Sequence, residues 1–567
     1  MKKAHVCVII ILAVCGVSCT GRSGSGTDGI PSLSPSGLMG DSLAFSKFTK
    51  PVDVHIGMSI NPIDTTLPPG DSPQNNQYTR YLRDNYNINV IVDWSAASGN
   101  DYNQKVSLCI ASNTLPDGLS VRSHAYVLKA AKSGMLYDIT DLFSRYASSQ
   151  AKGIVDSTKG RAARMVSYND RMIALPGVSV ITDGVHILTV QKQWLDMYGL
   201  PVPMTLDDIE NAAWVFKEKK PAGNATIPIA GPDKNTKLYC SFIESSSLVG
   251  GLDPVFQACD VYPGFFLDNG NGTVSYGSLD PKMKEPLARL ARWYKEGLLD
   301  PELGNRDSSG EVVNANQAGM RFGPWWSIGY GNSNSFKNNP RANWQSYPVY
   351  SAAGAWNLHM PAPGFAACLI NKRASPDTAA AIIIMYNALI RDEAVFDTSV
   401  DISWYPLRTV AAAADETEYE YRELTKVLKG QADPENYNDP MSIYKFIYHD
   451  ARIIRNVIPG YSPGRELNIA DFNMSNPGYF NRSYSLMIGN RPYATTRVDK
   501  EVYSVTYGMT DLLEQHWPNL WNMEAEVMMK IITGKAGMDA FDEFVAGWKT
   551  QGGQAILDDL AIQFLKN

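Results

Sequence analysis

The residues that most often carry out chemistry in enzymes form no known catalytic pattern in this sequence. Its seven His include no HExxH motif and no pair at metal-ligand spacing. A GxSxG nucleophile elbow and a GxxxxGK[ST] phosphate loop are also missing. A glycosidase needs only two carboxyl groups at a set separation in space, which sequence order does not reveal. A surface glycan hydrolase or lyase therefore stays open as an alternative, but we predict a non-enzyme without catalytic residues, cofactor or metal.

Aromatic residues are the second group whose chemistry suggests a function. The chain holds 12 Trp, 29 Tyr and 18 Phe. A flat ring covers the C–H face of a sugar, while neighbouring polar side chains bond its hydroxyl groups. The pair Trp325-Trp326 follows an apparent strand that Gly323-Pro324 ends, so one ring is expected to project at a strand end. For any single Trp, packing in the core remains the alternative.

The N-terminus predicts export. Lys2 and Lys3 precede an apolar run from Ala4 to Val17, and small residues lead to Cys19. This pattern is typical of a signal peptide over residues 1–18. It resembles a bacterial lipobox, except that Gly16 stands where an aliphatic residue is usual. Cys19 is therefore the predicted lipidation site, with a plain secreted protein as the alternative.

Polar residues follow Cys19, and the cysteine count of the chain is high for the family described below. Residues 19–47 are rich in Gly, Ser and Pro, which predicts a flexible tether to the membrane. Of the remaining cysteines, Cys240 and Cys259 are closest in sequence. An exported protein permits a disulfide between them, but buried free thiols are equally compatible with the spacing.

Composition excludes several classes of protein. Fifty-one Lys+Arg against 58 Asp+Glu give a formal net charge of −7, without the clustered bases that a nucleic-acid surface needs. No apolar stretch after the N-terminus is long enough for a polytopic membrane protein. With 567 residues, the chain exceeds what one hydrophobic core usually serves, so at least two domains are expected.

Strands and helices alternate along the chain, which predicts an α/β fold. Residues 52–58 and 90–94 alternate apolar and polar residues as strands do, while 77–85 and 101–112 have helical patterns. A hairpin is expected over 266–277, around an Asn-Gly turn. Further helices are expected over 280–297 and 376–391. Two more are expected over 523–560, with a break near 534–538.

Several segments, in order, resemble extracellular solute-binding proteins of the maltose-binding type (family 1), and among them the large lipoprotein branch. One is Met320–Trp326, which is similar to the family segment that ends in a sugar-stacking Trp. Others are 77–82, 90–94, 109–117, 171–176 and the closing run 531–553. Gly118 departs from the family, which prefers a β-branched residue there. The resemblance extends over about 480 residues.

The resemblance implies a two-lobed fold of the periplasmic-binding-protein type (type II), whose chain crosses between the lobes three times. Residues 48–176 and 362–405 are expected to form the N-lobe, and 177–361 and 406–567 the C-lobe. The crossings are expected near 175–179, 360–364 and 404–409. A ligand between the lobes would be trapped by hinge closure.

The implied function is that of a lipid-anchored substrate-binding protein of an ABC importer. It would be a monomer in the cell envelope, on the extracytoplasmic face or in the periplasm, that delivers an oligosaccharide to the permease subunits. The same fold binding a peptide or another polar solute is the alternative. The implied ligand contacts are Trp325, Trp326, Asp183, Arg122, His124, Trp404, Arg408 and Trp94.

Overall fold

The computed structural model describes residues 41–61, 64, 66–234, 237–243, 249–364, 366–393, 396–397 and 399–565. Cys19, the predicted signal peptide and most of the predicted tether lie outside these residues. Within them, no helix combines the length and the apolar character that crossing a membrane requires.

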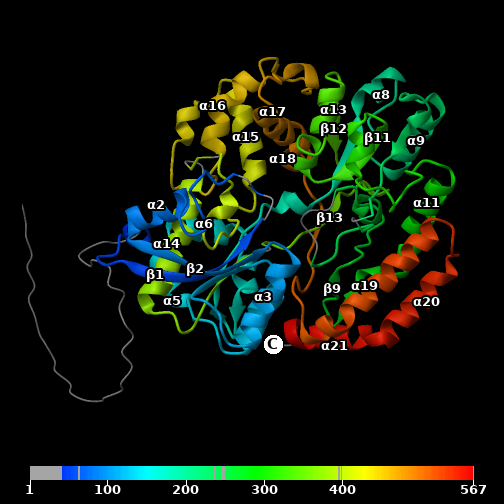
Figure 1. Ribbon diagram of the computed structural model, residues 1–567. Coiled ribbons are helices and arrows are strands. Elements are labelled where there is room, and N and C mark those ends of the chain that lie inside the picture. The colour runs from blue at the N-terminus through cyan, green and yellow to red at the C-terminus, as the bar shows by residue number, and fades with distance from the viewer. Residues whose placement is uncertain are drawn as a thin grey trace, which may run out of the picture.

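The first lobe is built on a five-stranded sheet with the order β2-β1-β3-β14-β6. Strands β1 (Val52–Ile60), β2 (Ile88–Ala97) and β3 (Gly118–Val121) run parallel, while β14 (Ala367–Ile370) lies antiparallel between β3 and β6 (Ala174–Pro176). Helix α14 (Pro376–Asp392), buried along most of its length, packs on β1. The predicted strand–helix alternation is confirmed here, with α2 (Gln77–Tyr86) and α3 (Asn100–Ala111) as the connecting helices (Figure 1).

The second lobe is built on a four-stranded sheet with the order β12-β7-β11-β8. Its members are β7 (Ile187–Gln191), β8 (Ile227–Ile229), β11 (Ala318–Gly323) and β12 (Trp344–Tyr347). Helix α9 (Leu206–Lys219) packs on β8 and begins at Thr205, whose hydroxyl accepts from the Asp208 amide in a capping box. The predicted hairpin is also confirmed, as β9 (Phe266–Asp268) and β10 (Val274–Tyr276).

Two groups of helices complete the second lobe. Helices α15 (Glu416–Leu428), α16 (Ile447–Val457) and α17 (Pro477–Tyr484) lie at the top of Figure 1, and α19 (Asp511–Ile532), α20 (Asp539–Trp548) and α21 (Gln554–Leu565) at its lower right. The break expected near 534–538 falls between α19 and α20. The expected pair of helices is a set of three, however, because the chain turns again at Gly552, whose φ is +112°.

The remaining elements connect these parts. The helices are α1 (Asp41–Ala44), α4 (His124–Lys132), α5 (Thr140–Tyr146), α6 (Ser149–Ser157), α7 (Arg161–Met165), α8 (Lys192–Met197), α10 (Asp253–Gln257), α11 (Lys284–Lys295), α12 (Gly310–Asn314), α13 (Ser333–Asn338) and α18 (Arg491–Thr495). The strands are β4 (Ser167–Tyr168), β5 (Arg171–Met172), β13 (Asn357–His359) and β15 (Lys500–Val502).

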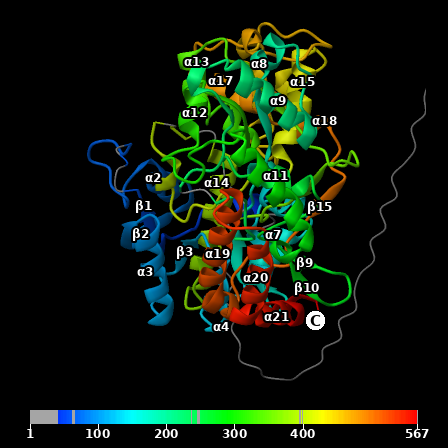
Figure 2. The same ribbon diagram turned by 90° about the vertical axis from the view of Figure 1, so that its right-hand side faces the viewer.

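The two lobes have separate hydrophobic cores, so the two-lobed α/β fold is confirmed. The core of the first lobe gathers around β1, β2 and α14, and that of the second around β7, α9, α11 and α19. A third cluster in the second lobe lies under α15–α17 and includes Trp325 and Trp344. Figure 2, turned by 90°, shows the molecule from the side of α19 and α20.

Three segments that cross between the lobes lie side by side. The Gly177 amide donates to Ala366 O over 2.7 Å, and the Val178 amide to Val410 O over 2.8 Å. A Cβ on Gly364 would lie 1.9 Å from Gly177 O, so only glycine permits this approach of two backbones. The third segment pairs at 410–412, a few residues beyond the expected 404–409.

Residues 41–47, at the end of the predicted tether, are folded against the first lobe. Ala44 and Phe48 are each only 1% exposed, and the Asp41 carboxylate accepts from the Ser149 amide at the start of α6. The polar composition of 19–47 hid this apolar end. None of the described cysteines, Cys109, Cys240, Cys259 and Cys368, forms a disulfide.

Candidate functional site

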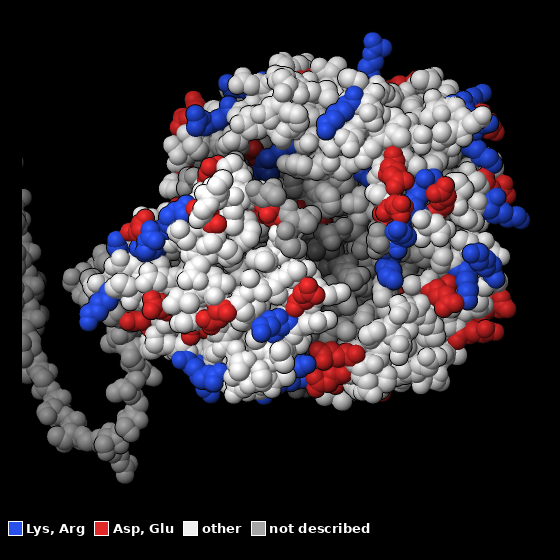
Figure 3. Space-filling view, in the orientation of Figure 1, with Lys and Arg blue, Asp and Glu red and all other residues white. Residues whose placement is uncertain are grey.

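A cavity of about 220 Å³ lies between the two lobes, beside the crossing segments. In space-filling view the molecule is hollowed between its parts (Figure 3). The described walls come from both lobes and from the crossings; among them are Arg122, His124, Met165, Gly177, Gly364, Ile243, Tyr507, Gly508 and Met509. A ligand held there would touch both lobes at once.

Arg122 is the charged residue among the described residues of the cavity wall. It follows β3 directly, and Ser123 then caps α4 by accepting from the Ala125 amide. Arg122 is exposed, and it forms no ion pair or hydrogen bond with any other residue that the structure describes. Its guanidinium therefore keeps its donors available for a ligand.

His124, the first residue of α4, meets the second lobe. A Cβ on Gly508 would lie 2.1 Å from its Nδ1, so the imidazole rests against the Gly508 backbone. Both ring nitrogens are out of contact with solvent and without a partner among the described residues. Burial lowers the pKa of His124 to about 4, which keeps the ring neutral near pH 7.

Asp183 holds the two tryptophans that follow β11. The Trp325 indole N–H donates to Asp183 Oδ1 over 2.8 Å, and the Trp326 indole N–H donates to Asp183 O over 3.3 Å. Burial raises the pKa of Asp183 to about 6, against the opposing effect of the Trp325 hydrogen bond. Three predicted site residues are thus brought into one cluster.

The rings of this cluster differ in exposure. Trp325 is 6% exposed and packs in the core of the second lobe, whereas Trp326 is partly exposed and Tyr330, one turn later, is 46% exposed. Arg482 lies nearby, because its charge affects the pKa of both Asp183 and Tyr330. Trp326 and Tyr330 therefore present more aromatic surface to solvent than Trp325.

Asp183, Trp325 and Trp326 are not among the described residues that line the cavity, and neither are the three other predicted contacts. Trp404 is 7% exposed in the core of the first lobe, and its indole N–H donates to Asp64 over 3.1 Å. Arg408 faces Glu393 at 3.9 Å. Trp94 packs on Gly57 and Tyr102, beneath Lys105. Each has a structural role in the first lobe.

The sequence reasoning missed Ile243, Tyr330, Tyr507 and Met509. All four lie in connections or short turns, where neither a period nor a known motif distinguishes a binding residue from any other loop residue. Only the approach of the second lobe to α4 and α7 places Ile243, Tyr507 and Met509 in the cavity.

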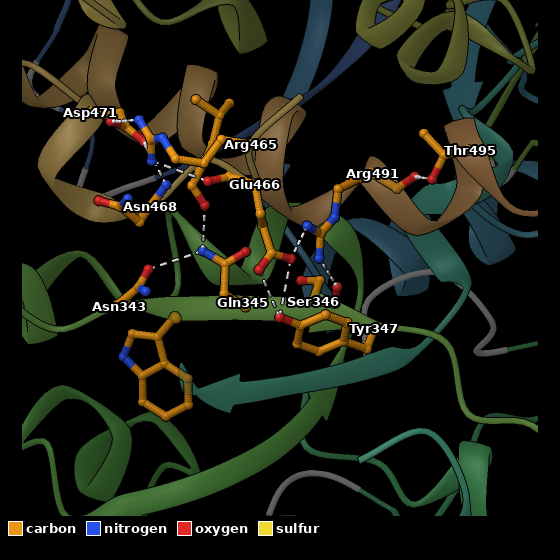
Figure 4. Close-up of polar contacts among 12 residues, drawn as sticks. Asn343, Gln345, Ser346, Tyr347, Arg465, Glu466, Asn468, Asp471, Arg491 and Thr495 are labelled. Atoms are coloured by element: carbon orange, nitrogen blue, oxygen red, sulfur yellow. Dashed lines mark hydrogen bonds and ion pairs between the residues drawn. The ribbon is translucent and has the colours of Figure 1, made fainter. Parts of the chain in front are cut away.

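A second polar cluster, around residues 465–471, supports strand β12 (Figure 4). Glu466 pairs with Arg491 and accepts from the Tyr347 hydroxyl, while Arg465 pairs with Asp471 at 2.9 Å. The Gln345 amide donates to Leu467 O over 3.0 Å. Because these charges satisfy one another, we assign the cluster to holding the edge of the sheet.

Comparisons with known proteins agree with the two-lobed fold. No family model matches the chain. The fructooligosaccharide ABC transporter substrate-binding protein FusA of Streptococcus pneumoniae is 24% identical over 272 residues, which cover 46% of this chain and 47% of FusA. Lipoprotein LipO of Bacillus subtilis is 24% identical over 230 residues, covering 39% of this chain and 40% of LipO.

Solved structures match over most of the chain. A solute-binding protein of Bifidobacterium longum infantis, described as an HMO-binding, ABC-transporter-associated protein, has a TM-score of 0.57 at 15% identity, covering 91% of this chain and 99% of that one. The sequence matches span about half, or less, of the length of the curated relatives. The expected resemblance is confirmed: the chain has the fold of the extracellular solute-binding proteins and is similar in sequence to an ABC transporter substrate-binding protein and to a lipoprotein.

Proposed function

We propose that this chain is the lipid-anchored substrate-binding protein of an ABC importer and captures an oligosaccharide between its lobes. The observation that carries the proposal is the cavity whose wall is shared by both lobes and by the crossing segments. A ligand there contacts both lobes only when they are close together, so its binding energy favours closure. The substrate-binding role of FusA supports the proposal.

The available side chains suit a sugar. Arg122 offers several N–H donors to hydroxyl groups, and Trp326 and Tyr330 offer ring surface near Asp183. No pair of carboxylates is among the described residues that line the cavity, which gives no support to a hydrolase. Reversible capture without turnover is therefore the function that we infer.

A glycan panel tests the proposal. Titration calorimetry on the full chain should show saturable binding of one class of oligosaccharide, with the sugar recovered unchanged. Arg122→Ala should weaken that binding by about tenfold, the scale of a lost hydrogen bond to a charged donor. An exposed arginine of the first lobe outside the cavity supplies the matched control, Arg83→Ala. Binding of peptides alone, or cleavage of a bound glycan, would contradict the proposal.

A further inference from the structure

Arg321 is a buried cation in strand β11 of the second lobe. The residue is only 1% exposed, and it forms no ion pair within the part of the chain that the structure describes. Burial lowers the pKa of Arg321 to about 10, and no described acid opposes that effect. Because taking a charge out of water costs free energy, the groups that this guanidinium binds must offset the cost.

The guanidinium reaches from the strand to the turn that follows it. Its Nη2 donates to Ser327 O over 3.3 Å and to the side-chain oxygen of Asn332 over 2.5 Å. Ser327 and Asn332 are themselves fully buried. Asn332 precedes α13 but does not cap it with its side chain, which is turned toward Arg321 instead. Arg321 therefore ties together the two ends of residues 327–332.

The segment between these two ends carries Tyr330, which is 46% exposed. The Tyr330 amide donates to Trp326 O over 3.1 Å. The turn is tight, since a Cβ on Gly331 would lie 2.6 Å from Ser327 O and 3.4 Å from Nη2 of Arg321. The exposed phenol thus belongs to a short turn whose inner side contacts the guanidinium.

Neutral groups hold the rest of this segment. The hydroxyl of Ser485 donates to Trp326 O over 3.2 Å, which fixes the start of the segment. The side-chain amide of Asn314 donates to Gly331 O over 3.3 Å. A hydrogen bond from a charged donor is roughly twice as strong as one between neutral groups. Arg321 therefore contributes the strongest of these contacts to the part that carries Tyr330.

We propose that Arg321 is a positioning residue for the sugar contacts near Asp183. It holds Tyr330 in the orientation in which its ring, beside Trp326, can cover the C–H face of a sugar. A turn without such a tie would have to be ordered on binding, which lowers affinity. Arg321 thus acts through Tyr330 without touching the ligand, and the inference rests on the proposed function.

Hydrogen exchange on the full chain, without sugar, tests the positioning. Arg321→Met removes both bonds, so the amides of 327–333 should exchange about tenfold faster than in the wild type. The melting temperature should change little, because the variant also removes a buried charge that no acid compensates. Arg455→Met is the control, since Arg455 binds Val427 O elsewhere in the same lobe, and it should leave exchange at 327–333 unchanged.

A double-mutant cycle with the sugar from the glycan panel tests the effect on binding. Arg321→Met should weaken binding by about fivefold to tenfold, and Arg321→Lys, which keeps a charged donor, should retain most of the affinity. In a chain that already carries Tyr330→Ala, Arg321→Met should weaken binding no further, because it acts through that ring. If Arg321→Met melts well below the wild type, Asn332→Ala, which removes one of the two acceptors, replaces it in both measurements.

Two results would overturn the inference. One is unchanged exchange at 327–333 in the variant that loses the Arg321 bonds. The other is equal weakening by Arg321→Met with and without the Tyr330 ring, which would indicate a role in stability alone. If no sugar of the panel binds the wild type, the proposed function fails and with it the effect on the ligand, while the exchange measurement still decides whether Arg321 holds the turn.

Discussion

At the scale of single residues, the proposed sugar contacts near Asp183 form an aromatic surface of more than one ring. Asp183 accepts a hydrogen bond from each indole N–H, through its carboxylate from Trp325 and through its backbone oxygen from Trp326. Trp325 is almost fully buried. Trp326 is left partly exposed beside Tyr330. The buried ring and Asp183 therefore position the exposed one.

Replacing the exposed ring should reduce affinity for the ligand. Trp326→Ala should weaken oligosaccharide binding by about tenfold or more, since truncating an aromatic anchor costs ~2 kcal/mol. Calorimetry with the sugar from the glycan panel measures this. The matched control is Trp214→Ala on α9, whose ring is also partly exposed but lies under Lys217. Equal losses in the two variants would mean that the effect is on stability.

A buried carboxyl predicts how stability depends on pH. Glu524 of α19 accepts from the hydroxyls of Tyr239, Tyr276 and Ser278, yet burial raises its pKa from 4.5 to about 7. The folded state thus holds a proton that the unfolded state releases near pH 4.5. The resulting stabilisation is complete below pH 4.5 and is lost as the pH rises through 7.

Glu524→Gln should remove that dependence. The fall in melting temperature between pH 5 and pH 8 should be smaller in the variant than in the wild type, by an amount that corresponds to at most about 3 kcal/mol. Differential scanning calorimetry at several pH values measures it. The exposed Glu543→Gln on α20 serves as the control. A parallel pH profile in all three proteins would refute the assignment.

At the scale of elements, the crossing segments are expected to tolerate substitution poorly. Gly177 and Gly364 bring two backbones together, and the third segment pairs with Val178 through Val410 and Ala412. No side chain can move aside to make room, because the atoms in the way belong to the backbone.

Gly364→Ala should therefore damage the hinge. The added Cβ would lie 1.9 Å from Gly177 O, so we expect a lower melting temperature and weaker ligand binding than in the wild type. Gly547→Ala on α20 is the control, since its Cβ meets other atoms only at 3.7 Å and beyond. That change should be neutral or slightly stabilising, because Ala favours a helix over Gly by ~1 kcal/mol. Similar melting temperatures for Gly364→Ala and the wild type would contradict the close approach.

The sequence predicted elements better than it predicted the site. The strand at 52–58, the hairpin at 266–277 and the break near 534–538 depend on local periodicity or turn residues, which act within a few positions of each other. The neighbours of Trp404 and Arg408 depend on the packing of distant segments. Trp404 was predicted to contact ligand from its place near a crossing, whereas its indole is bonded to Asp64, 340 positions away.

The order of the family motifs along the chain identified two residues of the cavity wall that local sequence patterns could not identify. Arg122 and His124 were singled out by their place after a strand in the family resemblance, and both line the described cavity. Tyr507 and Met509 had no such marker. They reach the cavity only because the connection before α19 meets the first lobe, a contact between segments almost 400 positions apart.

At the scale of the whole molecule, side-chain contacts join the lobes away from the crossings. The Lys132 ammonium lies 3.0 Å from Asp511, Arg161 stacks over Tyr503 at 3.8 Å, and Gln150 donates to Ser442 O over 2.6 Å. An exposed ion pair such as Lys132–Asp511 stabilises by at most about 1 kcal/mol. The Lys445 ammonium also pairs with Glu393 of the first lobe at 2.6 Å, with only 6% of the Lys445 side chain exposed, so the proposed hinge opening would have to break this pair as well.

Small-angle X-ray scattering of the full chain, with and without the oligosaccharide found in the panel, tests this account most directly. Closure around the sugar predicts a radius of gyration that falls on saturation with ligand and recovers when the sugar is removed. In Arg122→Ala the same fall should need a higher sugar concentration. An unchanged radius at full occupancy, with the sugar nonetheless bound, would contradict capture between the lobes.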